Sequence, residues 1–328
     1  MRFAQGERTS VVARDLRVCE RAQVAWASRF RLLGRTRMNL SFVDMASLVG
    51  RDLTALMTRN TRITLVIGGH GKTGRRVAQK LSAQGRHVRI GSRTGEPAFD
   101  WNESATWGPA LESVDQVYVT YHPDLAFPGA AEQVGEFSRT AVANRVRRLV
   151  LLSGRAEEAA QVSENNLKAS GADWTIVRSS WFNQNFSESF FLDPVLAGEL
   201  ALPTGDAVEA FVDADDIADV VVAALTDDQH IGKTYELSGP RLISYSDVAS
   251  EISKATGREI TYVPVTSEAY RAVLRENYLP EEFVDLFATV LDGRNAHLVH
   301  GVEEALGRKP KDFADFARDA AAAGVWNL

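Results

Sequence analysis

From Ile63 onward, short runs of apolar and β-branched residues alternate with stretches in which apolar residues recur every three or four positions. The short runs predict strands at 63–67, 87–91, 97–100, 115–120, 148–153 and 173–178. The longer stretches predict helices at 72–84, 104–112, 129–145 and 156–170. Strands and helices in this order predict an α/β fold with a doubly wound parallel sheet of the Rossmann type.

The pattern changes after Ser179, where an aromatic and Asn-rich segment, WFNQNFSESFF, follows the last of these strands. The sequence predicts an amphipathic helix with an acidic N-terminus at 215–225 and a further strand in TYELSG. From about residue 241 the pattern predicts mostly helix, and either Ser244 or Ser246 would cap the first of these helices. We therefore expect three parts. These are a poorly ordered extension over 1–58, a Rossmann domain over 59–240, and a smaller helical lobe over 241–328, with 181–207 contributing to the cleft.

Composition narrows the classes of function. The formal net charge of −6 leaves no electrostatic footprint for nucleic acid. No apolar run reaches the roughly 18 residues that a transmembrane helix needs, so no membrane partner is expected. The single cysteine, Cys19, fits a reducing cytoplasm, and the scattered histidines predict no metal site. We expect a cytoplasmic protein, a monomer or homodimer, that acts on a small molecule.

The first 56 residues differ from the rest, with ten Arg, no Lys and five acidic residues. Two interpretations remain for this basic stretch. It is either a functional arm or targeting segment, or an appendage that precedes a natural start at Met57. We favour the second interpretation, because the segment has a weak hydrophobic pattern and the first strand of a compact domain follows soon after Met57.

The stretch GGHGKTG, residues 68–74, carries the clearest chemistry in the sequence. Its Gly-Lys-Thr ending resembles a phosphate-binding P-loop, but Val66 stands where that motif needs its first glycine, and no strand ends in a magnesium-binding Asp. Gly69, Gly71 and Gly74 instead have the spacing of the dinucleotide fingerprint, after a strand and at the start of a helix. The loop therefore predicts a bound nicotinamide dinucleotide.

The second strand distinguishes between the two nicotinamide cofactors. NAD sites commonly end this strand with an acidic residue that binds the ribose 2′-hydroxyl. Here the strand ends with Gly91, Ser92 and Arg93, and Arg93 would pair with the 2′-phosphate of NADPH. NADPH is therefore predicted, with NADH as the weaker cofactor; the alternative for Arg93 is an arginine in a solvated loop.

Several motifs together resemble a known family. The segments are GGHGKTGRRVAQKL, VRIGSR, GADWTIVRSSWFNQNF, FVDADDIADVVVAAL and YELSGPRLISYSDVA. They are similar to the NmrA-like branch of the atypical short-chain dehydrogenases, from about Arg62 to the C-terminus. FDW, SWFNQNFSE and LDGRNAH resemble the subgroup of ergot-alkaloid reductases, the agroclavine and festuclavine dehydrogenases. Members of the wider branch include NADPH quinone reductases, azoreductase-like enzymes and redox-sensing regulators without turnover.

The resemblance implies a role for each matching position. The pyrophosphate would lie on the loop of Gly68, Gly69, His70, Gly71, Lys72, Thr73 and Gly74. The adenosine half would contact Ser92, Arg93 and Asp100, and the ribose and nicotinamide would contact Thr120, Tyr121, His122, Ser153 and Gly154. A wall of the substrate cleft would be formed by Trp181, Phe182 and Asn185.

One departure from the wider dehydrogenase pattern affects the chemistry. The helix expected at 156–170 contains no Tyr, so the usual Tyr-x-x-x-Lys acid is missing. Glu164 and Lys168 have the right spacing but are expected to form an exposed helix pair. The catalytic residue is therefore unknown, with Tyr121, His122 and Ser153 as candidates.

Two other polar groups have alternative roles. Asp213, Asp215 and Asp216 are expected to cap and charge a helix N-terminus rather than to bind a metal. Arg294, Asn295 and His297 either border the cleft or belong to a loop.

Without a strong acid, hydride transfer favours acceptors that need little protonation, such as iminium ions and quinones. The sequence thus predicts an NADPH-dependent reductase of a small electron-poor acceptor. The alternative is a non-catalytic regulator that senses redox state by binding NADP.

Overall fold

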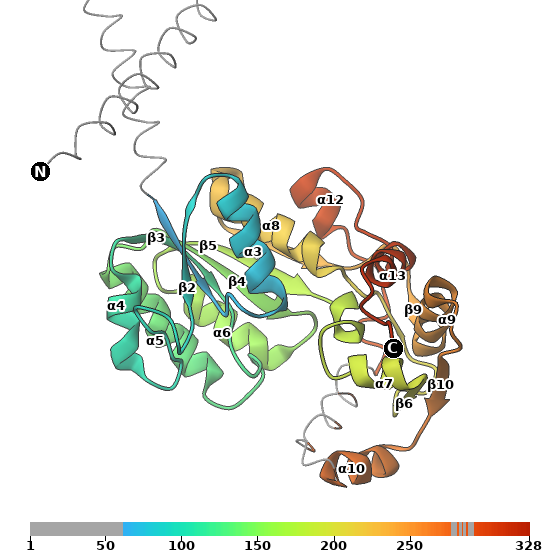
Figure 1. The fold of residues 1–328 in the computed structure, drawn as a ribbon. Coiled ribbons are helices and arrows are strands. Elements are labelled where there is room, and N and C mark those ends of the chain that lie inside the picture. Colours follow the sequence, from blue (N-terminus) through green and yellow to red (C-terminus); the bar gives the residue numbers. More distant parts are fainter. Residues whose placement is uncertain (1–61, 277–280, 282–283, 285–286, 288–291) are drawn as a thin grey trace, which may run out of the picture. The chain divides into compact units, whose positions relative to one another are not determined.

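The computed structural model describes residues 62–276, 281, 284, 287 and 292–328, all within the compact unit Thr58–Leu328 (Figure 1). The expectations for the N-terminal extension, and most of those for the helical pattern at 280–293, lie outside the described residues. Within the described ranges, no helix is both long enough and apolar enough to cross a membrane.

Six parallel strands form the central sheet in the order β2-β1-β3-β4-β5-β8 (Figure 1). The strands are β1 (Ile63–Ile67), β2 (His87–Gly91), β3 (Val114–Val119), β4 (Arg148–Gly154), β5 (Asp173–Ser179) and β8 (Lys233–Leu237). The chain places β2 on one side of β1 and β3 on the other, so the strand order reverses at β1. The predicted Rossmann-type sheet is confirmed. Such a reversal leaves a crevice at the carboxyl ends of β1 and β3, where open α/β sheets bind ligands.

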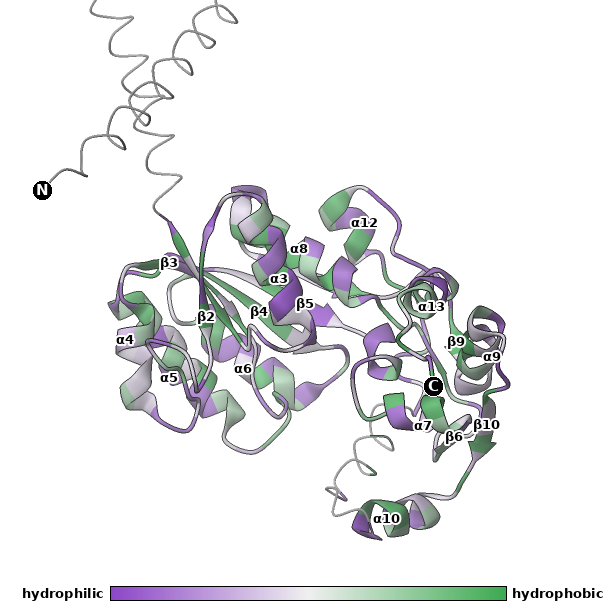
Figure 2. Cartoon of the chain, viewed as in Figure 1, coloured by the Kyte–Doolittle hydropathy of each residue, from purple (hydrophilic) through white to green (hydrophobic). Residues whose placement is uncertain are grey.

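Helices cover both faces of the sheet. One face is covered by α3 (Lys72–Ala83), α8 (Ala214–Thr226) and α12 (Gly301–Leu306), and the other by α4 (Trp107–Leu111), α5 (Ala130–Ala143) and α6 (Glu158–Lys168). Neighbouring strand residues enter opposite cores: Leu65 packs on the α5 side and Val66 on the α8 side, and both are fully buried. Figure 2 shows the hydrophobic colour in the strands between the helix layers, which explains their almost unbroken apolar sequences.

The strand predicted at 97–100 is wrong, because these residues form a loop. Pro97 has no N–H to donate to a ladder, and Phe99 and Trp101 bury their rings in the core under α5. The Trp101 indole N–H donates to the carbonyl oxygen of Thr120 at 3.0 Å, which attaches the loop to the end of β3. The helix predicted at 104–112 is divided into η1 (Ser104–Thr106) and α4.

A third core holds the C-terminal lobe together. The helices of the lobe are α7 (Leu192–Ala197), α9 (Tyr245–Thr256), α10 (Ser267–Glu276) and α13 (Phe313–Ala322), and the short turn η2 (Asn183–Phe186) adds Phe186 to this core. The other short turn, η3 (Asp228–His230), follows α8. Buried aromatic rings, among them Phe186, Phe211 and Phe313, pack edge to face in its centre. Ser244 begins α9 as part of a capping box with Asp247, so the first of the two predicted caps is correct.

Four short strands in this lobe were not predicted. β6 (Glu199–Leu202) pairs in parallel with β10 (Thr261–Pro264), and β7 (Val208–Glu209) pairs antiparallel with β9 (Ile243–Ser244). Strands of two to four residues are too short to show a hydrophobic period, so their pairing comes from tertiary contacts.

Truncation of Leu200, which is fully buried in β6, should lower the free energy of unfolding by about 2–5 kcal/mol, through lost burial and a residual cavity. The matched control is Leu298→Ala, because the Leu298 side chain is 42% exposed; it should cost less than about 1 kcal/mol. Urea unfolding followed by circular dichroism measures both. Equal losses in the two variants would contradict the assignment of β6 to the lobe core.

Candidate functional site

The glycine loop turns directly from β1 into α3. Gly68 has a φ of +65°, a left-handed conformation that glycine adopts without strain, and a side chain there would lie 2.6 Å from Thr120 Oγ1. The amide of Gly71 donates to the carbonyl oxygen of Gly68 at 2.8 Å, which closes the turn. A Cβ on Gly74 would overlap that same carbonyl oxygen, so α3 can approach β1 this closely only with glycine at 74.

The first turn of α3 faces the crevice without a side-chain cap. Gly71 is the N-cap residue and makes no side-chain hydrogen bond to the helix, and the first turn contains no acidic residue. Uncapped amides and the positive end of the helix dipole favour an anion at this position. Thr73 is buried and accepts a hydrogen bond from Tyr118 Oη at 3.0 Å, whereas His70 is exposed.

The segment after η2 covers Lys72, the first residue of α3. Burial lowers the pKa of the Lys72 ammonium, and its Nζ lies 5.9 Å from the centre of the Phe190 ring. Glu188, two residues before Phe190, forms ion pairs with Arg75 and Arg76 of the same helix. Arg76 also donates to the carbonyl oxygen of Lys72 at 2.8 Å. One helix thus carries the glycine loop and holds the segment that covers it.

A cavity of about 550 Å³ opens at the carboxyl ends of β3, β4 and β5. Its lining is more apolar than polar in character, because aromatic side chains from several segments meet there. The predicted residues that it brings together are Lys72, Thr120, Tyr121, His122, Ser153, Gly154, Trp181, Phe182 and Asn185. Sequence reasoning missed Phe127 and Phe190, which line the same cavity and are 41% and 44% exposed at its rim.

The residues predicted for the adenosine half lie outside this cavity. Ser92 follows β2, and its carbonyl oxygen accepts the amides of Gly95 and Phe99, which folds the loop back on itself. Arg93 is exposed, and its guanidinium makes no hydrogen bond or ion pair with the described residues. Asp100 lies in the loop that was predicted as a strand, and its Oδ1 accepts the amide of Asn102 at 3.0 Å.

The three candidate catalytic residues have different surroundings. Tyr121 donates from Oη to Gln133 Oε1 at 2.7 Å, and burial, with a smaller effect of Glu132, raises the pKa of its phenol. His122 is exposed on the rim. Ser153 is buried, and its hydroxyl donates to Glu164 Oε1 at 2.8 Å.

Glu164 is not the exposed residue that was expected. Its side chain is fully buried and receives two hydrogen bonds from Arg178 of β5, each 2.8 Å long. Burial alone would raise the pKa of this carboxyl, but the hydrogen bonds from Arg178 and Ser153 outweigh burial and lower it. Lys168 lies 3.5 Å from Glu164, with Nζ over the Trp174 ring. The expectation was wrong because the partner, Arg178, lies on another element.

Two carboxyl groups that sequence reasoning missed, Asp124 and Glu157, line the cavity. Burial, and after it the charge of the Asp124 carboxyl, raises the pKa of Glu157 to about 8. Both residues are in loops that follow strand ends, which is the only sequence signal that could have indicated them.

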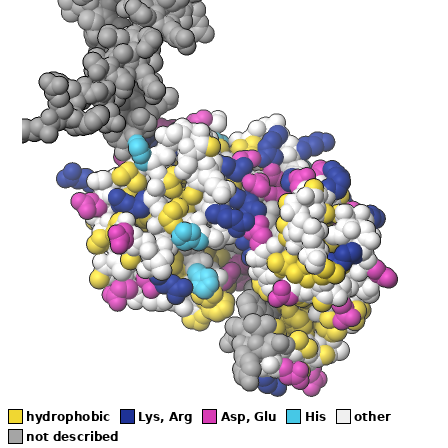
Figure 3. All heavy atoms as spheres, in the orientation of Figure 1, with side chains coloured by type: hydrophobic (Ala, Val, Ile, Leu, Met, Phe, Trp, Pro, Cys, Tyr) yellow, Lys and Arg dark blue, Asp and Glu magenta, His cyan; other side chains and the backbone are white. Residues whose placement is uncertain are grey.

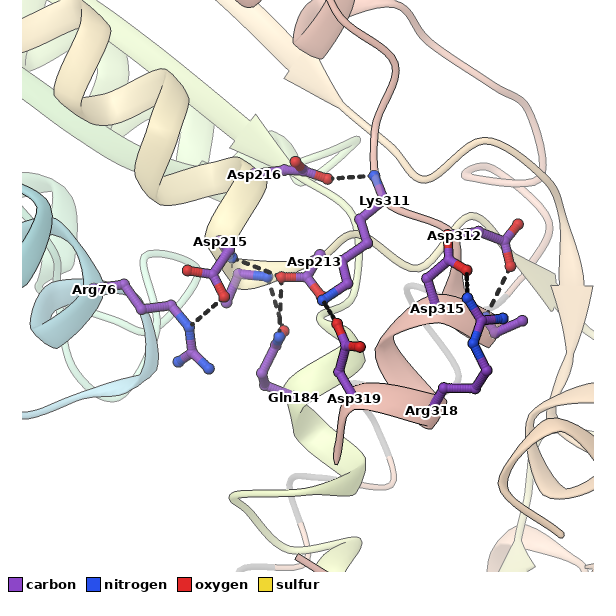
Figure 4. Close-up of polar contacts among 12 residues, drawn as sticks. Arg76, Gln184, Asp213, Asp215, Asp216, Lys311, Asp312, Asp315, Arg318 and Asp319 are labelled. Carbon is purple, nitrogen blue, oxygen red and sulfur yellow. Dashed lines mark hydrogen bonds and ion pairs between the residues drawn. The ribbon is translucent and has the colours of Figure 1, made fainter. Parts of the chain in front are cut away.

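The three aspartates at the start of α8 join neighbouring elements (Figure 4). Asp213 is the N-cap residue and accepts the amide of Asp215 at 2.8 Å, as predicted. Asp215 points to Arg76 of α3, and Asp216 accepts the amide of Lys311 at 2.7 Å. On the face drawn in Figure 3, positive and negative side chains lie intermingled, as such a network requires. Among the described residues, no group of His, Cys, Asp and Glu is arranged to hold a metal ion.

The polar cluster near 295 borders the segment after β4 and does not line the cavity. Arg294 pairs with Asp292 and donates to the carbonyl oxygen of Ala156 at 3.3 Å. His297 Nε2 lies 3.0 Å from the guanidinium of Arg155. The cluster therefore contacts the backbone next to Glu157.

Comparisons with known proteins find relatives that match most of the chain. A sequence model of the NmrA-like family matches residues 158–317, and one described as NAD(P)H-binding matches residues 68–228. Agroclavine dehydrogenase of Claviceps fusiformis is 30% identical over 277 residues, which cover 78% of this chain and 96% of that protein. The NAD(P)H azoreductase of Xenophilus azovorans is 28% identical over 287 residues, 79% of this chain and 98% of that protein.

Among solved structures, the NADPH complex of the quinone oxidoreductase QOR2 from Escherichia coli matches with a TM-score of 0.63 and 20% identity. The match covers 78% of this chain and 99% of that chain. At this identity the likeness concerns the fold. The part of the chain that matches the NAD(P)H-binding model begins with the glycine loop, which directly follows β1.

Gly74→Ala should raise the dissociation constant for NADPH at least about tenfold, since a methyl group at 74 displaces the first turn of α3 from β1. Gly108→Ala in α4 is the matched control, because a Cβ there meets nothing within 4 Å; it should leave binding unchanged. Quenching of tryptophan fluorescence during NADPH titration measures both constants. Unaltered binding by Gly74→Ala would contradict the role of this close approach.

Proposed function

This chain belongs to the NmrA-like family of NAD(P)H-binding oxidoreductases, and on that premise we propose that it reduces a small electron-poor acceptor with NADPH. The resemblance in sequence motifs is thereby confirmed. The observation that supports the proposed reaction most is the cavity, which joins Lys72 of the glycine loop to an aromatic wall. An apolar pocket that meets the cofactor loop suits a flat, uncharged or cationic acceptor.

The residues at the strand ends would place the cofactor. Gly68 to Gly74 and the amides of α3 would hold the pyrophosphate, with Lys72 supplying positive charge. Ser92 and Arg93 would bind the 2′-phosphate, because β2 ends without a carboxylate that could bind the 2′-hydroxyl of NADH. Thr120, Tyr121, His122, Ser153 and Gly154 would then line the ribose and nicotinamide, with Asp100 near the adenine.

An aromatic wall would bind the acceptor opposite the nicotinamide. Trp181 and Phe182 follow β5 directly, and Asn185 and Phe190 come from the next turns of the chain. Trp181 stacks at 5.3 Å on Phe287 and at 6.5 Å on Phe191, so the lobe core supports its ring. A supported ring loses little freedom when an acceptor stacks on it, which favours binding of planar molecules.

The acceptor class follows from the side chains around the cavity. Bound NADPH supplies a hydride, and an isolated carbonyl that received it would need a strong acid to neutralise the alkoxide. Helix α6, with the sequence EAAQVSENNLK, contains no tyrosine for that purpose. Iminium ions, quinones and azo compounds need less assistance, so positioning by the pocket accounts for much of the rate.

Arg93→Asp should raise the Michaelis constant for NADPH by roughly 10- to 100-fold, since a charge-assisted hydrogen bond is worth about 1.5–3 kcal/mol. The constant for NADH should change less than about twofold by the same reasoning, since NADH has no 2′-phosphate. Arg145→Asp is the control, because Arg145 is also exposed but precedes the amino end of β4, whereas Arg93 follows the carboxyl end of β2. Equal effects of Arg93→Asp on both cofactors would contradict the proposed site.

The reaction itself is tested by NADPH oxidation with menadione, crystal violet, an azo dye and cyclohexanone. We expect turnover of one or more of the first three and negligible turnover of the ketone, because an isolated carbonyl is much less electron-poor than these acceptors and forms a strongly basic alkoxide. Rapid reduction of cyclohexanone alone would contradict the acceptor class. Tight NADPH binding without oxidation of any acceptor would instead support the second candidate, a sensor that binds NADP without turnover.

A further inference from the structure

Glu157 has an unusual position at the start of α6. It is the N-cap residue of this helix, yet its side chain makes no capping hydrogen bond. An N-cap side chain ordinarily accepts an amide of the first turn. The Glu157 carboxyl instead lies against Gly154 at the end of β4, where a Cβ on Gly154 would overlap it. The carboxyl therefore lines the cavity where the reacting groups would meet.

Asp124 is the second carboxyl group in this part of the cavity. It lies in the loop after β3, and its Oδ1 accepts the amide of Ala126 at 2.8 Å. Both carboxyl groups line the same cavity, and burial raises the pKa of each. The amide of Ala126 opposes this rise at Asp124, whereas the charge of Asp124 adds to it at Glu157, so Glu157 is the group that holds the proton.

We propose that Glu157, paired with Asp124, is the proton donor to acceptors that become anionic when they take up hydride. The inference rests on the proposed function and adds a proton donor for the anion that a quinone leaves. Two observations independent of the carboxyl pair indicate that a ligand occupies this cavity: the uncapped first turn of α3 next to Lys72, and the aromatic wall.

Other titratable groups face the same space from the surrounding elements. Lys72 comes from α3, and Tyr121 and His122 come from the end of β3. Arg294 reaches the carbonyl of Ala156 beside Glu157 but pairs with Asp292. The Tyr121 hydroxyl already donates a hydrogen bond to Gln133, and burial raises the pKa of this phenol. Tyr121 is therefore a weaker acid than Glu157. Burial and the Asp124 carboxyl raise the pKa of Glu157 to about 8, which is near neutral pH and suits a general acid.

The proton and electron balance differs between two classes of acceptor. A quinone that accepts hydride becomes a hydroquinone anion; the O–H bond of Glu157 breaks, and a new O–H bond forms on the hydroquinone. Glu157 is left as a carboxylate and recovers a proton from water at the open rim. A triarylmethyl cation that accepts hydride becomes neutral, so no proton moves. Glu157 should therefore affect only the first reaction through proton transfer.

The experiment compares menadione, a quinone, with crystal violet, a triarylmethyl cation, in Glu157→Gln. The ratio of kcat for menadione to kcat for crystal violet should fall about 100-fold, at the low end of what general acids contribute. Glu158→Gln is the matched control, because Glu158 is exposed and does not line the cavity; its ratio should equal that of the wild type. NADPH binding measured by fluorescence verifies that each variant is folded.

The dependence of kcat on pH is a second measurement, and a purely structural role of Glu157 would not affect it. With menadione, kcat of the wild type should fall as pH rises through about 8, where Glu157 loses its proton. Asp124→Asn removes a carboxyl that raises the pKa of Glu157, so the fall should move to lower pH. With crystal violet, neither profile should show this fall.

The outcomes separate the two proposals. If the wild type oxidises NADPH with none of menadione, crystal violet and the azo dye, the proposed function fails and the inference fails with it; turnover without menadione overturns the inference alone. If both acceptors turn over but Glu157→Gln leaves their ratio unchanged, the proposed function stands and the inference is wrong. A pH profile that Asp124→Asn does not shift also overturns the inference.

Discussion

The close approach of α3 to the end of β1 is the constraint on which the rest of the site depends. It requires glycine at position 74, because a Cβ there would overlap the carbonyl oxygen of Gly68, and Gly68 itself has a positive φ and lies against Thr120. This contact directs the first amides of α3 into the crevice where the strand order reverses. It also positions Arg75 and Arg76, which hold the segment around Glu188, and brings α3 against α8.

Features encoded in neighbouring residues could be predicted from the sequence. The glycine loop, the strands at 63–67 and 148–153 and the Ser244 cap depend on local conformation and on periodic burial, and each has a recognisable pattern. The strand predicted at 97–100 shows where this reasoning fails. Its apolar character is real, but Phe99 serves the core as part of a loop, because an apolar run alone does not tell a strand from a buried loop.

Contacts between distant segments could not be predicted. Glu164 was expected to be exposed, because the helix sequence does not show that Arg178 of β5 lies above it. The pairing of Asp124 with Glu157 depends in the same way on two loops that meet only when β3 and β4 lie side by side. For Glu164 and for Glu157, the sequence shows that a carboxyl group is present. Which groups surround it, and therefore its pKa, depends on the fold.

The segment of Glu188 and Phe190, which borders the cavity, is held by α3, and α3 also supplies Lys72 to the cavity lining. Glu188 is held by two arginines of α3, and Phe190 lies over Lys72 at the start of that helix. Movement of this segment away from the cavity would separate Glu188 from both arginines and Phe190 from Lys72. Any widening of the cavity at Phe190 would therefore also remove two ion pairs from the helix that carries the glycine loop.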